Sequence, residues 1–260
     1  MNVTTACDFT ALNRAGLNLQ AVFDLDQLPA KIVAQLFNGD APVSRYRQLI
    51  LIGHAGKTLW DAVKASGIHS ENPIDDFSVL AVEHWFAAQF AGKVHAIVYP
   101  GNTPLGLQAL GALAGWHHTS PLRVGICAEW GTWYAYRVAL LTDTALPPSR
   151  PACSESPCTT CRERFCIASC PAGALDDGEL RLEKCIGYRK SSESRCKATC
   201  VARVSCPVGS THRYRDDQLR HAYTISLQAI EQHGRCVDAR APGAHAMTEK
   251  GASGCMVEIT

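Results

Sequence analysis

Eight cysteines in the second half of the chain are spaced so that they could hold metal clusters. Ten of the 13 cysteines lie between Cys153 and Cys236, and eight of these form two consecutive quartets that each end in Cys-Pro. The first quartet is spaced C-x2-C-x4-C-x3-C-P and the second C-x10-C-x3-C-x5-C-P. Their members are Cys158, Cys161, Cys166 and Cys170, then Cys185, Cys196, Cys200 and Cys206. Since a [4Fe-4S] cluster binds four soft thiolates, the two quartets predict two such clusters.

The two-cluster ferredoxins of bacteria indicate how these ligands are shared. In that pattern the fourth cysteine of each run binds the other cluster. Carried onto this sequence, Cys206 joins the first three cysteines of the first quartet, and Cys170 joins the first three of the second. The loops are longer than in the ferredoxin pattern, by two residues between Cys161 and Cys166.

Two other uses of the cysteines compete with iron. Structural zinc stays open, because four-cysteine zinc sites also use C-x2-4-C knuckles, although the Cys-Pro pairs favour iron–sulfur. A disulfide framework needs an oxidising compartment and usually a secretory signal. Residues 1–20 contain Asp8 and Asn13 and no apolar core of the signal-peptide kind, and no stretch reaches the roughly 18 apolar residues of a membrane span. We therefore expect a cytoplasmic protein that has no membrane partner.

The charge of the chain argues against a general nucleic-acid or membrane binder. The formal net charge is +1, which gives no global attraction to either surface. Residues 181–220 are nevertheless net +6, with ten basic and four acidic side chains. Thiolate-bound clusters are anionic, so we interpret this segment first as electrostatic compensation. An RNA-binding or partner-docking face is the alternative.

The region before the cysteines reads as alternating strands and helices, an α/β (α+β) arrangement. Strands are expected at 47–54 and 93–99, and helices at 58–65, from a cap at Asn72 or Asp75 through Phe90, and at 104–116. Residues 122–127 and 133–142 read as the two strands of a hairpin. The proline-rich stretch 146–151 is a linker. We expect three parts: 1–148, the cysteine domain 149–220, and a helix ending at Gly234 with its tail in 221–260.

The first part resembles the cobalamin-processing proteins that decyanate and dealkylate cobalamin. The resemblance covers about residues 45–148 and is carried by NPIDDFS at 72–78, GALAGWHH at 111–118 and VGICAEWGTWYAYRVALL at 124–141. It implies a nitroreductase-like domain that holds a corrinoid base-off, partly against the hairpin 125–137. Arg137 matches an arginine that contacts glutathione in the animal members, and Cys127 stands where these proteins usually have histidine. The implied cofactor-binding residues are Trp116, His117, Gly125, Ile126, Cys127, Gly131, Trp133, Tyr134 and Arg137.

The cysteine-rich part is similar to epoxyqueuosine reductase and the reductive dehalogenases. The CIGY motif at 185–188 resembles the CISY of the queuosine enzyme. The resemblance implies a small ferredoxin-like 2[4Fe-4S] domain joined to a corrinoid-binding domain. The chain ends at Thr260 without the long carboxy-terminal helical repeats of epoxyqueuosine reductases, which disfavours a tRNA substrate without excluding it.

Together the two resemblances imply an oxidoreductase. A donor (ferredoxin, flavodoxin or a reductase) would pass electrons through two clusters to the cobalt of cobalamin or another corrinoid, to remove its upper ligand or to reduce it. Two alternatives stay open: a cobalamin-dependent reductase of an organic substrate, with Asp75 or Glu129 as proton donor, and an electron-transfer protein that binds no corrin. Ligation of a metal by Cys153 or Cys127, and pairing of two chains around the cofactor, also stay open.

Overall fold

A computed structural model describes residues 7–37, 45–151 and 155–238 of the chain. The chain divides into two compact units. The first comprises Met1–Thr119, Gly125–Thr160 and Val208–Arg213, and the second comprises Ser120–Val124, Cys161–Pro207 and Tyr214–Thr260. Cys153, for which metal ligation stayed open, and most of the predicted tail lie outside the described residues. No helix in the described part is long and apolar enough to span a membrane.

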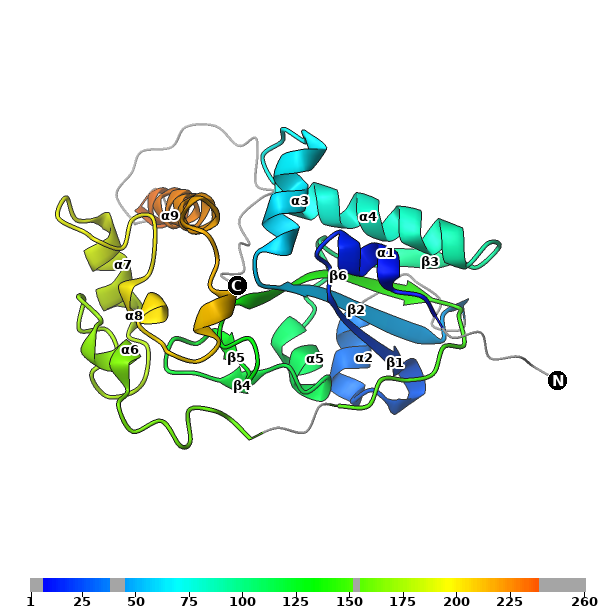
Figure 1. The fold of residues 1–260 in the computed structure, drawn as a ribbon, viewed down its shortest axis with the longest axis horizontal. Helices are drawn as coiled ribbons and strands as arrows, with labels where there is room; N and C mark the ends of the chain where they lie inside the picture. Colours follow the sequence, from blue (N-terminus) through cyan, green and yellow to red (C-terminus); the bar gives the residue numbers. More distant parts are fainter. Residues whose placement is uncertain (1–6, 38–44, 152–154, 239–260) are drawn as a thin grey trace. The chain divides into compact units, whose positions relative to one another are not determined.

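The first unit is built on a four-stranded antiparallel sheet in the order β1-β2-β6-β3 (Figure 1). The strands are β1 (Leu19–Asp24), β2 (Gln48–Ala55), β3 (His95–Tyr99) and β6 (Tyr134–Thr142). The helices of this unit are α1 (Thr10–Arg14), α2 (Ala30–Leu36), α3 (Thr58–Ser66), α4 (Pro73–Gln89) and α5 (Leu107–Leu113), with a 3-10 turn η1 (Leu25–Gln27). The fold is therefore mixed α/β with a small antiparallel sheet.

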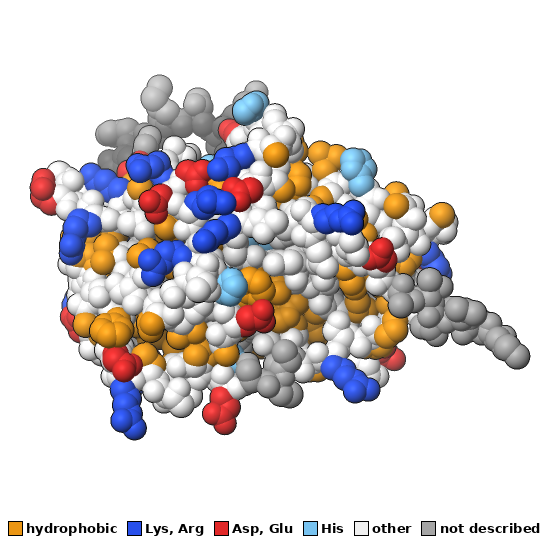
Figure 2. Space-filling view, in the orientation of Figure 1, with side chains coloured by type: hydrophobic (Ala, Val, Ile, Leu, Met, Phe, Trp, Pro, Cys, Tyr) orange, Lys and Arg blue, Asp and Glu red, His pale blue; other side chains and the backbone are white. Residues whose placement is uncertain are grey.

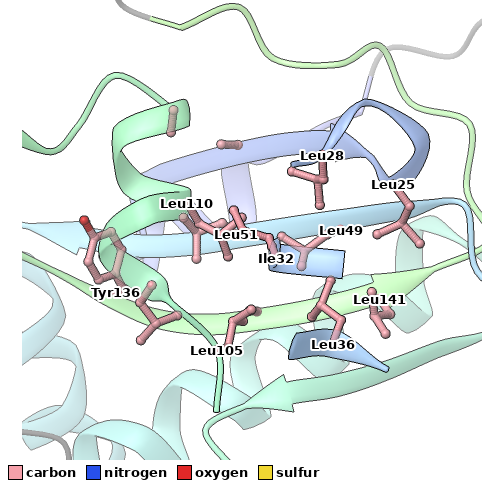
Figure 3. Close-up of a cluster of buried hydrophobic side chains, with 14 of the residues drawn as sticks. Leu25, Leu28, Ile32, Leu36, Leu49, Leu51, Leu105, Leu110, Tyr136 and Leu141 are labelled. Carbon is pink, nitrogen blue, oxygen red and sulfur yellow. The ribbon is translucent and has the colours of Figure 1, made fainter. Parts of the chain in front are cut away.

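Helices cover both faces of the sheet, so its central strand is buried throughout. All eight residues of β2 are buried, which explains why Gln48–Ala55 is an almost unbroken apolar run. Leu49 and Leu51 point into a core shared with α2 and α5, seen in Figure 3. Ile50 and Ile52 point into a second core shared with α1, α3 and α4.

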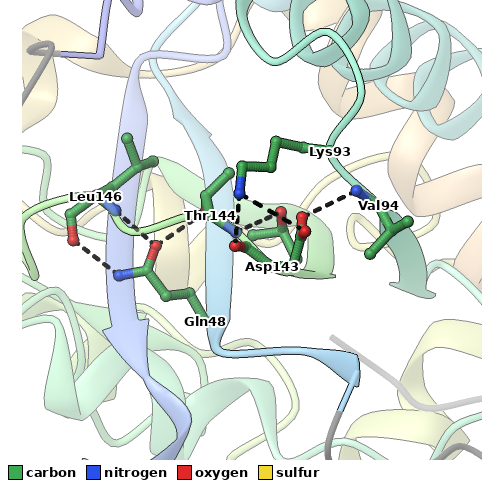
Figure 4. A network of polar contacts seen from close by, with 7 residues as sticks. Gln48, Lys93, Val94, Asp143, Thr144 and Leu146 are labelled. Atoms are coloured by element: carbon green, nitrogen blue, oxygen red, sulfur yellow. Dashed lines mark hydrogen bonds and ion pairs between the residues drawn. The ribbon is translucent and has the colours of Figure 1, made fainter.

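One buried polar side chain fastens the end of the sheet to the chain that leaves it. Gln48 is 2% exposed, and its amide donates to Asp24 Oδ1 and to the Leu146 carbonyl, each at 2.7 Å. Its Oε1 accepts from Thr144 Oγ1 at 2.9 Å and from the Leu146 backbone at 2.8 Å (Figure 4). Every donor and acceptor of the amide is used, so its burial carries no unsatisfied group.

A β-bulge in the sheet sets the direction of Arg137. The β2–β6 register shifts between Ile52 and Gly53: Ile52 pairs with Val138, but Gly53 pairs with Tyr136. Arg137 is thus the extra residue on β6. A bulge of this kind changes which side chains face each side of a sheet. Tyr136 packs in the α2/α5 core, while Arg137 turns to the opposite face, toward α4.

The second unit consists of short helices between cysteines. They are α6 (Phe165–Ala168), α7 (Leu182–Lys190) and α8 (Val201–Val204), followed by the longer α9 (Asp216–Asp238). Helix α6 packs against α8, and α7 packs against α9. Figure 2 shows Lys, Arg, Asp and Glu side chains mixed on the surface over α9. The cysteine thiol of Cys200 caps α8, accepting from the Arg203 backbone N–H at 3.4 Å.

Several sequence predictions of elements are confirmed, and one is wrong. The strands 47–54 and 93–99, the helix 58–65 and the helix through Phe90 correspond to β2, β3, α3 and α4. The hairpin is wrong: β5 (Gly125–Ile126) pairs with β4 (His118–Thr119), whereas β6 pairs with β2 and β3. The helix predicted at 104–116 is shorter in the structure, where it is α5. The helix predicted to end at Gly234 is α9, which continues to Asp238. β1 and α2 were not predicted.

Candidate functional site

Three thiols of the cysteine unit form one group: Cys161, Cys166 and Cys206. Burial raises the pKa of the Cys166 thiol, and the Cys206 and Cys161 thiols act on it electrostatically, both in the raising direction. Cys206 is distant in sequence from Cys161 and Cys166. Cys166 lies in α6, and Cys206 follows α8 by two residues. These two helices pack together, so the fold brings the last cysteine of the second quartet to the first quartet. Cys158 belongs to the other unit and is partly exposed.

Four further thiols of this unit form a second group: Cys170, Cys185, Cys196 and Cys200. Burial raises the pKa of Cys185 to about 11; Cys200, Cys170 and Cys196 raise it too, while Arg189 lowers it. Burial also raises the pKa of Cys200, where the Arg203 backbone and guanidinium lower it and Cys196 and Cys170 raise it. Cys170, the last member of the first quartet, therefore interacts with the thiols of the second.

The donor set of both groups is chemically uniform. The eight cysteines are free thiols and partly or fully buried. No three or more His, Cys, Asp or Glu side chains in the described ranges are arranged around a point that could hold a single metal ion. In a four-iron cube each thiolate binds a different iron, so its thiols lie farther apart than those around one zinc ion. Thiolates are the ligands that iron–sulfur clusters take, so the donor type fits a cluster.

The first unit carries a hydrogen-bonded group of aromatic side chains at the end of the α2/α5 core. His117 Nδ1 lies 3.1 Å from the Tyr136 hydroxyl, and the Tyr134 ring packs edge to face on the Tyr136 ring with centroids 6.0 Å apart. Trp116 stacks on Tyr136 with ring centroids 6.5 Å apart. Burial raises the pKa of Tyr136, which keeps its hydroxyl neutral, and burial next to His118 lowers the pKa of His117. Gly125 leaves room for the Tyr134 side chain, because a Cβ at this position would lie 2.0 Å from the Tyr134 hydroxyl.

A tight turn closes around Cys127. Cys127 and Gly131 pair by backbone hydrogen bonds of 3.0 Å in both directions. The Trp130 backbone donates to Cys127 Sγ at 3.4 Å. Burial raises the pKa of Cys127, although backbone N–H groups of Trp130 and Glu129 lower it. The thiol is therefore protonated at neutral pH, while Glu129 lies exposed on the turn.

The segment Val208–Arg213 packs on this turn through two glycines. Gly131 has a φ of +58°, and a Cβ at that position would lie 2.1 Å from the Val208 carbonyl oxygen. Gly209 has a φ of +62°, and its Cβ would lie 2.4 Å from the Gly131 nitrogen. Trp130 contacts His212 with ring centroids 4.2 Å apart. Val208 follows Cys206 by only two residues, so a predicted cluster ligand is tethered to a segment held by this turn.

Arg137 lies apart from the aromatic group. Its Nε donates to His54 Nδ1 at 3.0 Å, and its Nη1 donates to Asp75 Oδ1 at 3.2 Å. Because His54 Nδ1 accepts a hydrogen bond, the ring is neutral with its proton on Nε2. Asp75, the candidate proton donor, is thus already paired with Arg137, at the first turn of α4.

The predicted cofactor residues fall into two sets. Trp116, His117, Gly125, Cys127 and Tyr134 lie around the aromatic end of the core. Arg137 points to the opposite face. Ile126 is buried in β5, and Trp133 is buried beneath Arg213, whose guanidinium lies 5.8 Å from its ring. Sequence reasoning missed Tyr136, His54 and Trp130; the aromatic alternation of Tyr134 and Tyr136 on one strand was the available signal for Tyr136.

Comparison with known proteins finds similarity at the level of structure. No protein-family model matches the sequence, and neither does any curated protein. Epoxyqueuosine reductase from Bacillus subtilis aligns over 79% of this chain and 66% of its own, at 14% identity and a TM-score of 0.49. The enzyme from Streptococcus thermophilus aligns over 88% and 84%, at 12% identity and a TM-score of 0.48.

A reductive dehalogenase is similar to the same extent. The catabolic enzyme NpRdhA, in complex with 3-bromo-4-hydroxybenzoic acid, aligns over 83% of this chain and 33% of its own, at 14% identity and a TM-score of 0.49. The chain therefore spans 66% of the Bacillus subtilis reductase and about a third of the dehalogenase.

Proposed function

We propose that this protein is an iron–sulfur oxidoreductase that passes electrons through two [4Fe-4S] clusters to the cobalt of a bound corrinoid. The observation that carries the proposal is the crossed grouping of the thiols: Cys206 acts on Cys166, and Cys170 acts on Cys185 and Cys200. Two-cluster ferredoxins share their ligands in this crossed way.

The proposed ligand sets follow from this grouping. One cluster takes Cys158, Cys161, Cys166 and Cys206, and the other takes Cys170, Cys185, Cys196 and Cys200. When bound, the clusters would supply one-electron redox chemistry. The chain holds the thiols partly buried, and their raised pKa values mean that cluster loading must release protons.

The corrinoid part rests on the motifs of the first unit and on the chemistry of the group around Tyr136. Trp116 and His117 are partly exposed, and each contacts the buried Tyr136. They combine a flat apolar ring with a polar group, which is typical of small-molecule sites. Cys127 is held neutral by burial. We propose this group as the surface that would bind cobalamin, with Arg137 acting on the other face of the sheet.

Anaerobic purification with iron and sulfide analysis tests the clusters. Two four-iron clusters require about eight iron per chain, and zinc in place of iron would refute the proposal. Double variants test the crossing. Cys166→Ala/Cys206→Ala removes two ligands of one proposed cluster and should keep about four iron, whereas Cys166→Ala/Cys170→Ala should lose both clusters. Uncrossed ligation would reverse these two results, and Cys7→Ala, a free thiol outside the quartets, is the control.

Titration with cobalamin in the same cuvette tests the second half of the proposal. A base-off spectrum at near-equimolar cobalamin is expected in the loaded wild type. Tyr136→Leu should weaken the binding, while Leu80→Ala, an exposed residue of α4, should leave it unchanged. Full iron content without any spectral change would leave an electron-transfer protein that binds no corrin.

A cobalamin-dependent reductase of an organic substrate is a second candidate, favoured by one observation. Glu129 is exposed on the Cys127–Gly131 turn, beside the proposed corrin surface, whereas Asp75 is engaged by Arg137. Glu129 is therefore the carboxyl group free to deliver a proton. Glu129→Gln should abolish substrate turnover with cobalamin binding intact, and undiminished turnover would remove Glu129 from this role.

A further inference from the structure

Arg189 is a buried cation held in place by neutral groups. Its residue is 7% exposed. Its Nε donates to the Cys196 carbonyl at 3.2 Å, its Nη1 to Ser226 Oγ at 3.0 Å and its Nη2 to the Tyr223 carbonyl at 2.8 Å. The guanidinium also lies 5.4 Å from the centroid of the Tyr223 ring. These contacts fix the position of the charge without neutralising it.

No carboxylate in the described part of the chain pairs with Arg189. The ion pairs found there involve other side chains, such as Arg137 with Asp75 and Arg181 with Asp177. A guanidinium stays charged at any physiological pH, and a buried charge without a counter-charge is strongly unfavourable. An anion bound close to Arg189 would therefore stabilise the buried charge.

The groups nearest to Arg189 indicate where that anion lies. Cys185 precedes Arg189 by four residues on α7, so the two side chains lie on the same face of the helix. Arg189 also bonds the backbone of Cys196, and its charge acts on the Cys185 thiol. Arg203 acts on Cys200 in the same way. The positive charge is thus directed at the group formed by Cys170, Cys185, Cys196 and Cys200.

We propose that Arg189 is the counter-charge of the cluster bound by Cys170, Cys185, Cys196 and Cys200, and that its charge makes this cluster easier to reduce. The inference rests on the proposed function. One-electron reduction adds a negative charge to the cluster, so a fixed neighbouring cation stabilises the reduced form more than the oxidised form.

A redox titration monitored by electron paramagnetic resonance tests this on the full chain, reconstituted anaerobically and reduced stepwise with dithionite. Arg189→Gln should shift the midpoint potential of the cluster at Cys170, Cys185, Cys196 and Cys200 alone to a more negative value, and Arg189→Lys, which keeps the charge, should shift it less. Arg195→Gln is the matched control, because Arg195 is exposed one residue before Cys196 and its charge is screened by solvent.

Two cysteine variants assign the signals. Cys185→Ser should change the signal of the cluster next to Arg189, and Cys161→Ser the signal of the other. A midpoint potential of the Cys185 signal that both Arg189 variants leave unmoved, or equal shifts of both signals, would overturn the inference while the clusters themselves stand. A wild-type chain that binds no iron would instead overturn the proposed function, and this inference with it.

Discussion

Gly131→Ala should destabilise the first unit by about 3 kcal/mol, because two separate penalties act at this position. The φ of +58° is a conformation that costs an alanine roughly 1 kcal/mol. The added Cβ would also lie 2.1 Å from the Val208 carbonyl oxygen and 2.8 Å from its carbonyl carbon. Since both are backbone atoms, the segment after Cys206 must move away, and overpacking of this kind costs about 1–3 kcal/mol.

Gly67→Ala separates the two penalties. Gly67 has a φ of +69° and ends α3 in the same unit, but a Cβ there meets nothing within 4 Å. This variant should therefore lose only the conformational part, about 1 kcal/mol. Urea denaturation followed by tryptophan fluorescence gives the free energy of unfolding of both variants from the midpoint and slope. Equal losses in the two variants would refute the close approach of the Cys127–Gly131 turn and the Val208–Arg213 segment.

Three further predictions concern the first unit. Asp75→Asn should lower the free energy of unfolding in urea by about 1 kcal/mol, because it removes a partly buried ion pair with Arg137. An unchanged free energy of unfolding would mean that the pair contributes nothing. Burial lowers the pKa of His117 below its usual 6.5, so the unfolded chain binds more protons and stability should fall as the pH drops from 6.5 toward the lowered pKa. His117→Phe should reduce this loss of stability at low pH. An unchanged dependence of the free energy of unfolding on pH would contradict the prediction. Gln48→Leu should cost about 3 kcal/mol by leaving buried backbone groups unpaired, whereas Gln89→Leu at an exposed position should cost almost nothing by the same denaturation.

Local signals were enough to predict the elements that form most of the sheet and its α4 face. β2 is an apolar run because it is buried on both faces, and that cause is visible in the sequence itself. Helix α4 starts at Pro73 after Asn72, a start signal that needs no knowledge of tertiary contacts. Its buried residues are Ser78, Val82, Trp85 and Phe86, whereas the large apolar side chain of Leu80 is 47% exposed. The packing partners of a helix decide its buried face, and they are not local.

The prediction that 122–127 and 133–142 form a hairpin was wrong because the partners of a strand are also not local. The residues Glu129–Gly131 do form a turn, as their types predict, but it closes only the Cys127–Gly131 bridge. Strand β6 finds its partners in β2, more than 80 residues earlier at Ile52 and Val138, and in β3. Pairing over such separations leaves no mark in a short window of sequence. The bulge at Arg137 is likewise set by pairing, so the sequence alone could not tell that the consecutive residues Arg137 and Val138 both lie on the α4 side of the sheet.

The long spacing between Cys185 and Cys196 acquires a physical reason in the fold. A ferredoxin run places its first two cysteines three residues apart, which leaves no room for a helix between them. Here Cys185 lies inside α7, and the helix continues to Lys190 before the chain returns to Cys196. The inserted turn carries Arg189, and Arg189 reaches forward to bond the Cys196 carbonyl. The departure from the ferredoxin pattern is therefore the feature that brings a buried positive charge to the second group of thiols. A chain shortened to the ferredoxin spacing would lose that charge, and the cluster at Cys170, Cys185, Cys196 and Cys200 should then be reduced only at a more negative potential.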